Sequence, residues 1–310
     1  MKNYDKIISV IKQEILEVNK YIFECLSSNI YVLSDDLCNF LLKKSKKIRA
    51  AVSILFIKSK YGKISDKQLK ILAITELIHN ASLIHDDIID DADVRRNEAT
   101  INNLFGNGSA VIIGDYVLAI ALKELINYEN VNLTNLFINA MYEVCKGEFE
   151  QDIQRKKLSA IDEYIVKSRR KTAELFKTAL SGALISENKY EVKEIAEQFT
   201  ENFGIMFQIK NDLTNFLNQE KTFGFEKSDI DNGIYTAPVI YLCENAGVEE
   251  IKNITKDDKN LLYAAEKTQG LLNLYGVKIL DLISSFPDNI YKSALIDLCM
   301  EVQKGKNDKN

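Results

Sequence analysis

Hydrophobic residues recur at spacings of three and four positions along almost the whole chain. In the first segment, Ile7, Ile11, Ile15 and Val18 follow this spacing, which places them on one face of an amphipathic helix. No segment shows the strict alternation of apolar and polar residues that is typical of a half-buried strand. The pattern predicts an all-α fold made of roughly ten helices.

Clusters of turn-forming residues separate the predicted helices. They lie near residues 27–29, 61–66, 97–108, 129–134, 157–162, 186–189, 219–233, 245–247 and 256–259. None of them has the length and the Gly, Ser or Pro content of a linker between domains. We therefore predict a single domain over residues 1–303, followed by a frayed polar tail over residues 304–310.

Composition agrees with a helical globular protein. Only two prolines, Pro238 and Pro287, interrupt the chain, so few segments contain a helix breaker. Hydrophobic residues make up 46% and charged residues 27% of the sequence, enough to bury a large core. The 40 basic residues are interspersed among 45 acidic ones and leave a net charge of -5, which argues against nucleic acid as a partner.

The five cysteines are scattered and form neither a CxxC pair nor a Cys/His cluster. This arrangement is typical of reduced thiols rather than of disulfides or zinc sites. The longest apolar runs are far too short to span a membrane, and the first residues lack the hydrophobic core of a signal peptide. We therefore expect a cytoplasmic protein.

An acidic cluster interrupts an apolar helical segment in HNASLIHDDIIDDAD, residues 79–93. Asp86 and Asp90 are four residues apart and project from one helix face, with Asp87 beside them, so their like charges repel one another. The apolar residues around them favour a cation site over a solvated helix end. Carboxylate oxygens at this spacing suit Mg²⁺, which keeps several waters and is often completed by substrate phosphates.

Two arginines follow the acidic cluster directly. The guanidinium groups of Arg95 and Arg96 are permanently charged forks that suit phosphate oxygens. The full stretch IHDDIIDDADVRRNEAT resembles the first aspartate-rich motif of the trans-polyprenyl diphosphate synthases. The resemblance implies a large helical bundle around a central cavity, in which isopentenyl diphosphate is condensed with an allylic diphosphate. It also implies roughly two to three Mg²⁺ ions.

Other segments resemble the part of these enzymes that binds isopentenyl diphosphate. KSKKIRA looks like a worn version of a Gly-Gly-Lys-Arg-x-Arg-Pro signature and retains Lys46 and Arg49. His79 precedes Asp86 by two helical turns and therefore lies on the same face. The resemblance implies that Lys46, Arg49, His79 and Arg96 bind the second diphosphate.

The segment YIVKSRRKTAELF resembles the Lys-Thr helix of the same family. The resemblance implies that Lys171, together with Arg95, contacts the allylic diphosphate and that Thr172 faces the developing cation. The amide of Gln208 is expected to place its oxygen near that cation.

The second aspartate-rich motif departs from the family pattern. FQIKNDLTNF has Asn211, Asp212 and Asn215 where the family normally has three aspartates. An amide oxygen can ligate Mg²⁺ but lacks the negative charge of a carboxylate. The implied metal ligands are therefore Asp86, Asp90, Asn211 and Asn215, with Asp87 and Asp212 orienting bound water. Downstream, Phe225 replaces a lysine that is usual in the family.

Product length is inferred from the residues that precede the first acidic motif. In the family a bulky aromatic residue there stops the growing chain early, whereas Ala81 and Ser82 are small. Small side chains leave room for the growing tail to pass this level. The resemblance therefore implies a product of about thirty carbons or more. A deeper floor would leave a farnesyl or geranylgeranyl diphosphate synthase as the alternative.

Three other functions remain open from the sequence. NDLTNFLNQ partly resembles the second metal motif of class I terpene cyclases, although a cyclase needs only one diphosphate site. The weakened motif also fits a partner-dependent subunit of a heteromeric synthase. The third alternative is a catalytically inert helical scaffold, which does not explain why the acidic and basic clusters both fall at the spacing of a diphosphate clamp. The family resemblance further implies a homodimer and, for a long lipid product, at most transient membrane contact.

Overall fold

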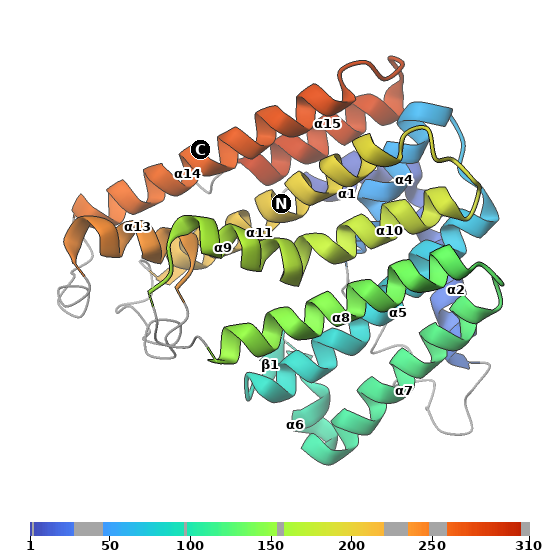
Figure 1. The fold of residues 1–310 in the computed structure, drawn as a ribbon, viewed down its shortest axis with the longest axis horizontal. Coiled ribbons are helices and arrows are strands. Elements are labelled where there is room, and N and C mark those ends of the chain that lie inside the picture. Colours follow the sequence, from blue (N-terminus) through green and yellow to red (C-terminus); the bar gives the residue numbers. More distant parts are fainter. Residues whose placement is uncertain are drawn as a thin grey trace.

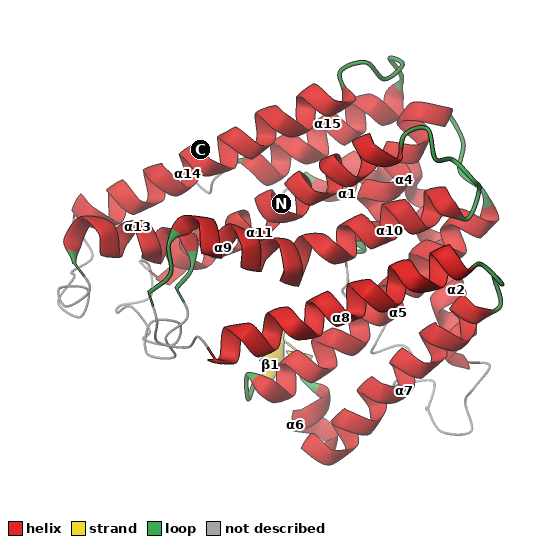
Figure 2. Cartoon of the chain, in the orientation of Figure 1, coloured by secondary structure: helices red, strands yellow, loops and turns green. Residues whose placement is uncertain are grey.

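Helices account for nearly all of the secondary structure in this computed structural model (Figure 2), which describes residues 1, 3–27, 46–95, 98–153, 158–219, 235–247 and 259–304. The helical elements are α1 (Tyr4–Ile8), η1 (Ser9–Ile11), α2 (Lys12–Ser27), α4 (Ile48–Tyr61), α5 (Asp66–Ile89), α6 (Ile101–Phe105), α7 (Asn107–Ile126), α8 (Val131–Ile153), α9 (Ile161–Ser168), η2 (Arg169–Ala173), α10 (Glu174–Ile185), α11 (Lys193–Gln219), α13 (Ala237–Ala246), α14 (Lys259–Ile283) and α15 (Ile290–Gln303). The strands are β1 (Val94–Arg95) and β2 (Glu98–Ala99).

Local sequence explains where several helices begin and end. The hydroxyl of Ser65 accepts from the backbone N–H of Gln68, whose side chain accepts from Ser65 in return, so a capping box starts α5. Asn289 caps α15 in a similar way through its side-chain oxygen. Gly62 follows α4 with φ +73°, a left-handed conformation that favours glycine. Pro238 lies in the first turn of α13, where a missing N–H costs nothing.

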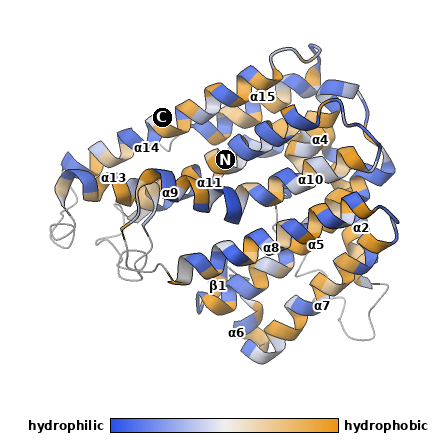
Figure 3. Ribbon diagram, in the orientation of Figure 1, coloured by the Kyte–Doolittle hydropathy of each residue, from blue (hydrophilic) through white to orange (hydrophobic). Residues whose placement is uncertain are grey.

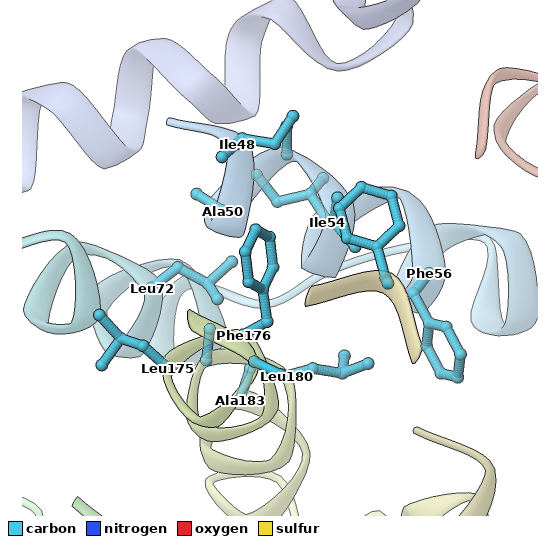
Figure 4. Close-up of a cluster of buried hydrophobic side chains, with 14 of the residues drawn as sticks. Ile48, Ala50, Ile54, Phe56, Leu72, Leu175, Phe176, Leu180 and Ala183 are labelled. Carbon is cyan, nitrogen blue, oxygen red and sulfur yellow. The ribbon is translucent and has the colours of Figure 1, made fainter. Parts of the chain in front are cut away.

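Helix α5 lies at the centre of the bundle and packs against α2, α4, α7 and α10. On the other side, α11 packs against α10, α13 and α14 (Figure 1). Figure 4 shows Phe176 of α10 pointing toward Ile48 and Ile54 of α4, with Leu72 of α5 beside it. This apolar contact joins α4, α5 and α10, and close packing fixes the positions of the three helices relative to one another.

The all-α prediction is confirmed, with one small exception. β1 and β2 form an antiparallel pair in which Val94 lies opposite Ala99. Figure 3 shows hydrophilic and hydrophobic residues alternating around the helices, as the spacing of apolar residues predicts. Among the described residues, no helix is both long enough and apolar enough to cross a membrane. The predicted first helix is split into α1, η1 and α2, although Ile11 and Val18 are fully buried.

Candidate active site

A cavity of about 590 Å³ lies between α4, α5, α7, α8, η2, α10 and α11. Its volume is in the range of small-molecule sites. The residues predicted from the sequence that line it are Lys46, Arg49, His79, Ala81, Ser82, Asp86, Arg95, Lys171, Thr172, Gln208 and Asn211. Segments separated by more than one hundred residues in the chain therefore meet at one site.

Four other predicted residues do not line the cavity. Asp90 caps the C-terminal end of α5 and is exposed, and Asn215 lies exposed on α11, one turn beyond Asn211. Asp87 and Asp212 are buried. Arg96 and Phe225 lie outside the described residues.

The acidic end of α5 carries an excess of negative charge. Burial raises the pKa of Asp86 to about 6, and the charges of Glu148 and Asp90 contribute to the increase. These carboxylates also lie at the C-terminal end of a helix, where the macrodipole is negative. A cation bound here would offset the burial of the Asp86 charge, its repulsion by the neighbouring carboxylates and the negative end of the helix macrodipole.

Lys171 faces this acidic end from η2. Its Nζ lies 2.6 Å from Glu148 Oε1 of α8. Burial alone would lower the pKa of Lys171, but the carboxylates of Glu148 and Asp86 outweigh it and raise the pKa. Lys171 is therefore a charged lysine held at the cavity wall.

Close packing brings α8 and η2 together at this point. A Cβ atom on Gly147 would lie 3.3 Å from Arg170 Cβ and 3.8 Å from the Lys171 backbone nitrogen, so the glycine allows this close approach. Arg170 pairs with Glu150 and, at 3.4 Å, with Glu143, both on α8. The five residues of η2 form a π-helical turn, a feature that often occurs at functional sites.

Arg95 connects the β1 strand to α5. Its Nε donates to Asp87 Oδ1 at 2.5 Å, and Arg95 itself lines the cavity. The buried Asp87 thus holds the guanidinium beside the acidic end of α5.

A second group of cations lies at the start of α4. Lys46, Lys47 and Arg49 line the cavity next to His79 and Glu76 of α5. The guanidinium of Arg49 lies 4.9 Å from the centre of the Phe176 ring, which supports it from below. A helix N-terminus combined with cationic side chains is suited to an anion.

The sequence pattern does not single out Lys47, and it leaves His85 as a structural residue, yet both line the cavity. Lys47 is buried, has φ +47°, and lies in the same basic run as Lys46. His85 lines the cavity, and its Nε2 lies 3.3 Å from Asp115 Oδ1. Only a glycine at position 114 leaves room for this ring, because a Cβ there would lie 2.4 Å from His85 Nε2.

A hydrogen-bonded chain of side chains leads from the interior to the cavity. The Tyr164 hydroxyl donates to Asp212 Oδ2 at 2.5 Å, and Gln208 Nε2 donates to Asp212 Oδ1 at 2.9 Å. The Thr172 hydroxyl donates to Gln208 Oε1 at 2.7 Å. Burial and the charge of Asp212 raise the pKa of Tyr164 well above its usual value. Tyr164 was not predicted, because only its position in the fold relates it to Asp212.

The donor set fits a hard divalent cation that keeps part of its water shell. Among the described residues, no group of three or more His, Cys, Asp or Glu side chains could enclose a metal ion. Asp86 and the amide of Asn211 nevertheless line one cavity. Mg²⁺ is typically held by one or two carboxylates with waters and substrate phosphates completing the shell, so the residues fit this ion.

Comparison with known proteins identifies the family. A sequence model described as polyprenyl synthetase matches residues 32–269. Decaprenyl-diphosphate synthase of Dictyostelium discoideum is 31% identical over 272 residues, which cover 82% of this chain but only 59% of that longer protein. Heptaprenyl diphosphate synthase component 2 of Geobacillus stearothermophilus is 28% identical and covers 96% of this chain and 97% of its own length.

A solved structure agrees with the sequence comparison. Heptaprenyl diphosphate synthase from Staphylococcus aureus superposes with a TM-score of 0.81 at 26% identity. The superposition covers 94% of this chain and 97% of that one. The chain therefore belongs to the polyprenyl synthetase family of prenyltransferases.

Proposed function

We propose that this enzyme condenses isopentenyl diphosphate with an allylic diphosphate in a Mg²⁺-dependent, head-to-tail chain elongation. One observation carries the proposal: a single cavity has two separate groups of cationic side chains. Lys171 and Arg95 lie beside the acidic end of α5, and Lys46 and Arg49 lie at the start of α4. Two diphosphates need two such groups, whereas a terpene cyclase needs one.

The allylic diphosphate occupies the acidic side of the cavity. Asp86 and Asn211, which line the cavity, would hold the metal, with Asp90 and Asn215 one turn further along the same helices; the ion would supply positive charge to the leaving diphosphate. Lys171 shares that charge, and Asp87 keeps Arg95 in place for the same purpose. Thr172 and Gln208 direct oxygen atoms toward the carbon that becomes positive as the bond to diphosphate breaks.

Isopentenyl diphosphate binds at the start of α4. Lys46, Arg49 and His79 grip its diphosphate, together with Arg96, and so hold its double bond in line with the allylic carbon. This positioning turns a bimolecular step into an effectively unimolecular one. A new carbon–carbon bond forms from the double bond of isopentenyl diphosphate, and a proton then leaves to the released diphosphate.

We infer a long product, of about thirty carbons or more, because a growing chain passes small side chains unhindered. Ala81 and Ser82 line the cavity one turn below Asp86, and Met141 and Val144 of α8 line it as well. The named relatives make decaprenyl and heptaprenyl diphosphates, which supports the same length class. Ala81→Phe should shorten the product, and an unchanged product distribution would mean that the floor of the cavity lies elsewhere.

A second candidate is a catalytic subunit that works only with a partner chain. The similarity to a protein named component 2 of a heptaprenyl diphosphate synthase favours it, as do the neutral amides of Asn211 and Asn215. Farnesyl and geranylgeranyl diphosphate remain the shorter-product alternatives. A cyclase is disfavoured by the second cation group.

We also infer a homodimer that uses the outer face of α6, α7 and α8. These three helices expose a series of large hydrophobic side chains. Single scattered hydrophobic residues are normal on a protein surface, but a series of them is typical of an interaction site. The exposed side chains are Leu104, Phe105, Val111, Ile112, Ile126, Val131, Ile138, Tyr142, Phe149 and Ile153. A cytoplasmic location and only transient membrane contact during product release complete the proposal.

The deciding experiment supplies labelled isopentenyl diphosphate and Mg²⁺ with allylic primers of about five to twenty carbons. The products are dephosphorylated and sized. Elongated linear alcohols support the synthase and give the product length. If primers bind but are not elongated, a candidate partner chain is added. Elongation in its presence would support the partner-dependent subunit, and no elongation would favour the cyclase.

A further inference from the structure

We infer that Glu76, a buried residue of α5, positions the cation group at the start of α4 and thereby sets the affinity for isopentenyl diphosphate. The inference rests on the proposed function, because that substrate is proposed to bind there. Glu76 is only 1% exposed, and it lines the cavity together with Lys46, Lys47 and Arg49. The proposed reaction gives this carboxyl group no task of its own. Its contact with the α4 backbone makes it a positioning residue.

The start of α4 cannot be capped by the side chain that precedes it. The first backbone N–H groups of a helix have no acceptor within the helix. In α4 the first intrahelical bond runs from the Ala51 N–H to the Lys47 oxygen at 2.8 Å, so the N–H groups before Ala51 need other acceptors. A serine, threonine, aspartate or asparagine usually supplies one from the N-cap position. The N-cap residue here is Lys47, and an ammonium group has donors only.

Glu76 supplies the missing acceptor from α5. Its Oε1 accepts from the Ala50 N–H at 3.3 Å. Ala50 is the third residue of α4, which is one of the two positions where a capping side chain normally accepts. The bond needs only an acceptor oxygen, and a carboxylate, a protonated carboxyl group and an amide all provide one. Glu76 therefore caps α4 from a neighbouring helix.

Two contacts from different helices hold the backbone that carries the cations. Lys47 has φ +47°, a left-handed conformation that is uncommon for a residue with a long side chain. Before it, the Tyr4 hydroxyl of α1 donates to the Lys46 backbone oxygen. After it, Glu76 holds the first turn of α4. Loss of the Glu76 contact would release only the second end of this segment, which is the end that carries Arg49.

The position of Arg49 is what the Glu76 contact should control. Arg49 directly precedes Ala50 in the chain, and its guanidinium lies 4.9 Å from the centre of the Phe176 ring. A guanidinium binds a phosphate group best when its fork is held in one orientation. A loosened first turn of α4 should therefore weaken diphosphate binding. The diphosphate of isopentenyl diphosphate does not react, so the loss should appear in KM rather than in kcat.

Two substitutions at position 76 separate the acceptor from the charge. Glu76→Gln keeps an acceptor oxygen at full reach and removes the charge, whereas Glu76→Asp keeps the carboxyl group and shortens the side chain by one methylene group. Calorimetry should show that the Kd for isopentenyl diphosphate rises about ten-fold in Glu76→Asp and stays within about three-fold of wild type in Glu76→Gln. Equal Kd values in the two variants, or weaker binding by Glu76→Gln, would overturn the inference.

Steady-state kinetics separates positioning from a general loss of structure. In Glu76→Asp, KM for isopentenyl diphosphate should rise about ten-fold, while kcat and KM for the allylic diphosphate stay within about two-fold. Leu77→Ala is the matched control: Leu77 is the next residue of α5, is fully buried, and is not among the described residues that line the cavity. It lowers stability by leaving a void and should keep both wild-type KM values. A rise in KM for isopentenyl diphosphate in Leu77→Ala, or a rise in both KM values in Glu76→Asp, would overturn the inference.

Hydrogen exchange tests the contact itself and needs no variant to fold. In the ligand-free wild type, the Ala50 N–H should exchange about as slowly as the Ala51 N–H, although only Ala51 has an acceptor within the helix. An Ala50 N–H that exchanges at the rate of an unstructured chain would overturn the inference. Wild-type protein that binds no isopentenyl diphosphate would contradict the proposed function, whereas equal binding by wild type and Glu76→Asp would contradict only this inference.

Discussion

The two aspartate-rich motifs lie on different helices around one cavity, α5 and α11, and they differ in charge and in burial. On α5, Asp86 lines the cavity, and its carboxylate is close enough to Asp90 and Glu148 for their charges to raise its pKa. On α11, the residue that lines the cavity is the neutral Asn211, and the carboxylate beside it, Asp212, points into the interior. Negative charge is thus concentrated on α5.

Because of this asymmetry, we expect the two helices to contribute differently to metal binding. The α5 wall is destabilised by its own charge and gains most from a bound cation. The α11 wall contributes neutral oxygens and a rigid hydrogen-bonded chain through Asp212. We therefore expect α5 to provide most of the binding energy for the proposed metal and α11 to position its ligands.

Asp86→Asn should have the largest effect on activity, because it removes the charge that distinguishes α5 from α11. Loss of the carboxylate should lower kcat/KM for elongation by about three orders of magnitude, or about 4 kcal/mol. Steady-state kinetics with labelled isopentenyl diphosphate measures it. Asp91→Asn is the control, because Asp91 is exposed, has φ +50° that asparagine tolerates, and does not line the cavity. Equal losses in both variants would show that net charge, not the Asp86 ligand, matters.

Lys171→Gln should give the next largest effect. The ammonium group faces the acidic wall at 2.6 Å from Glu148, and its removal should lower kcat/KM for the allylic diphosphate by about one hundred-fold. KM for isopentenyl diphosphate should not change, because we propose that Lys46 and Arg49 bind that substrate. Lys167→Gln, one turn earlier and outside the cavity lining, serves as the control. A raised KM for isopentenyl diphosphate would contradict the assignment of the two cation groups.

The same Asp86→Asn substitution should stabilise the metal-free protein at neutral pH. The pKa of Asp86 is raised from 3.8 to about 6, so between these values the folded state binds a proton that the unfolded state has lost. Stability should therefore fall as the pH rises through this window, by up to about 3 kcal/mol at 1.36 kcal/mol per pKa unit.

Urea unfolding with a chelator present measures this difference. The wild-type free energy of unfolding should decrease relative to that of Asp86→Asn between about pH 4 and pH 7. Saturating Mg²⁺ with inorganic diphosphate should remove the difference, since the bound cation relieves the buried charge. Parallel pH profiles without metal would show that Asp86 carries no such penalty.

Asn211→Asp should have the smallest effect, because it adds to α11 the kind of charge that α5 already carries. A carboxylate at this cavity-lining position should lower the Mg²⁺ concentration for half-maximal activity by about ten-fold, or 1.4 kcal/mol. Asn215→Asp should change it less, because Asn215 does not line the cavity. A larger effect at position 215 would place the metal further along α11.

Much of the fold followed from local sequence rules. The spacing of apolar residues predicted the long helices, and the turn near residues 61–66 matches the break between α4 and α5. The short helix α6 and the two-residue strands were not predicted, because a segment rich in Asn and Gly has no periodic pattern to read. The π-helical turn η2 was also missed, since its register depends on packing against α8 and α11.

The acidic motif, the basic run at Lys46 and the Lys-Thr pair could be found in the sequence because each is contiguous and carries its own chemistry. Tyr164 and His85 could not be found in this way. Their partners, Asp212 and Asp115, are distant in the chain, and a single tyrosine or histidine has no sequence signal for such a contact.

The sequence by itself determined which groups carry charge, which helices present them, and that the second motif has two amides in place of carboxylates. Only the tertiary structure decided that Asp212 turns inward, that Arg95 is held by Asp87, and that two cation groups share one cavity. The physical reason is that helix periodicity fixes the direction of a side chain relative to its own axis. The direction relative to the other helices depends on how the helices pack.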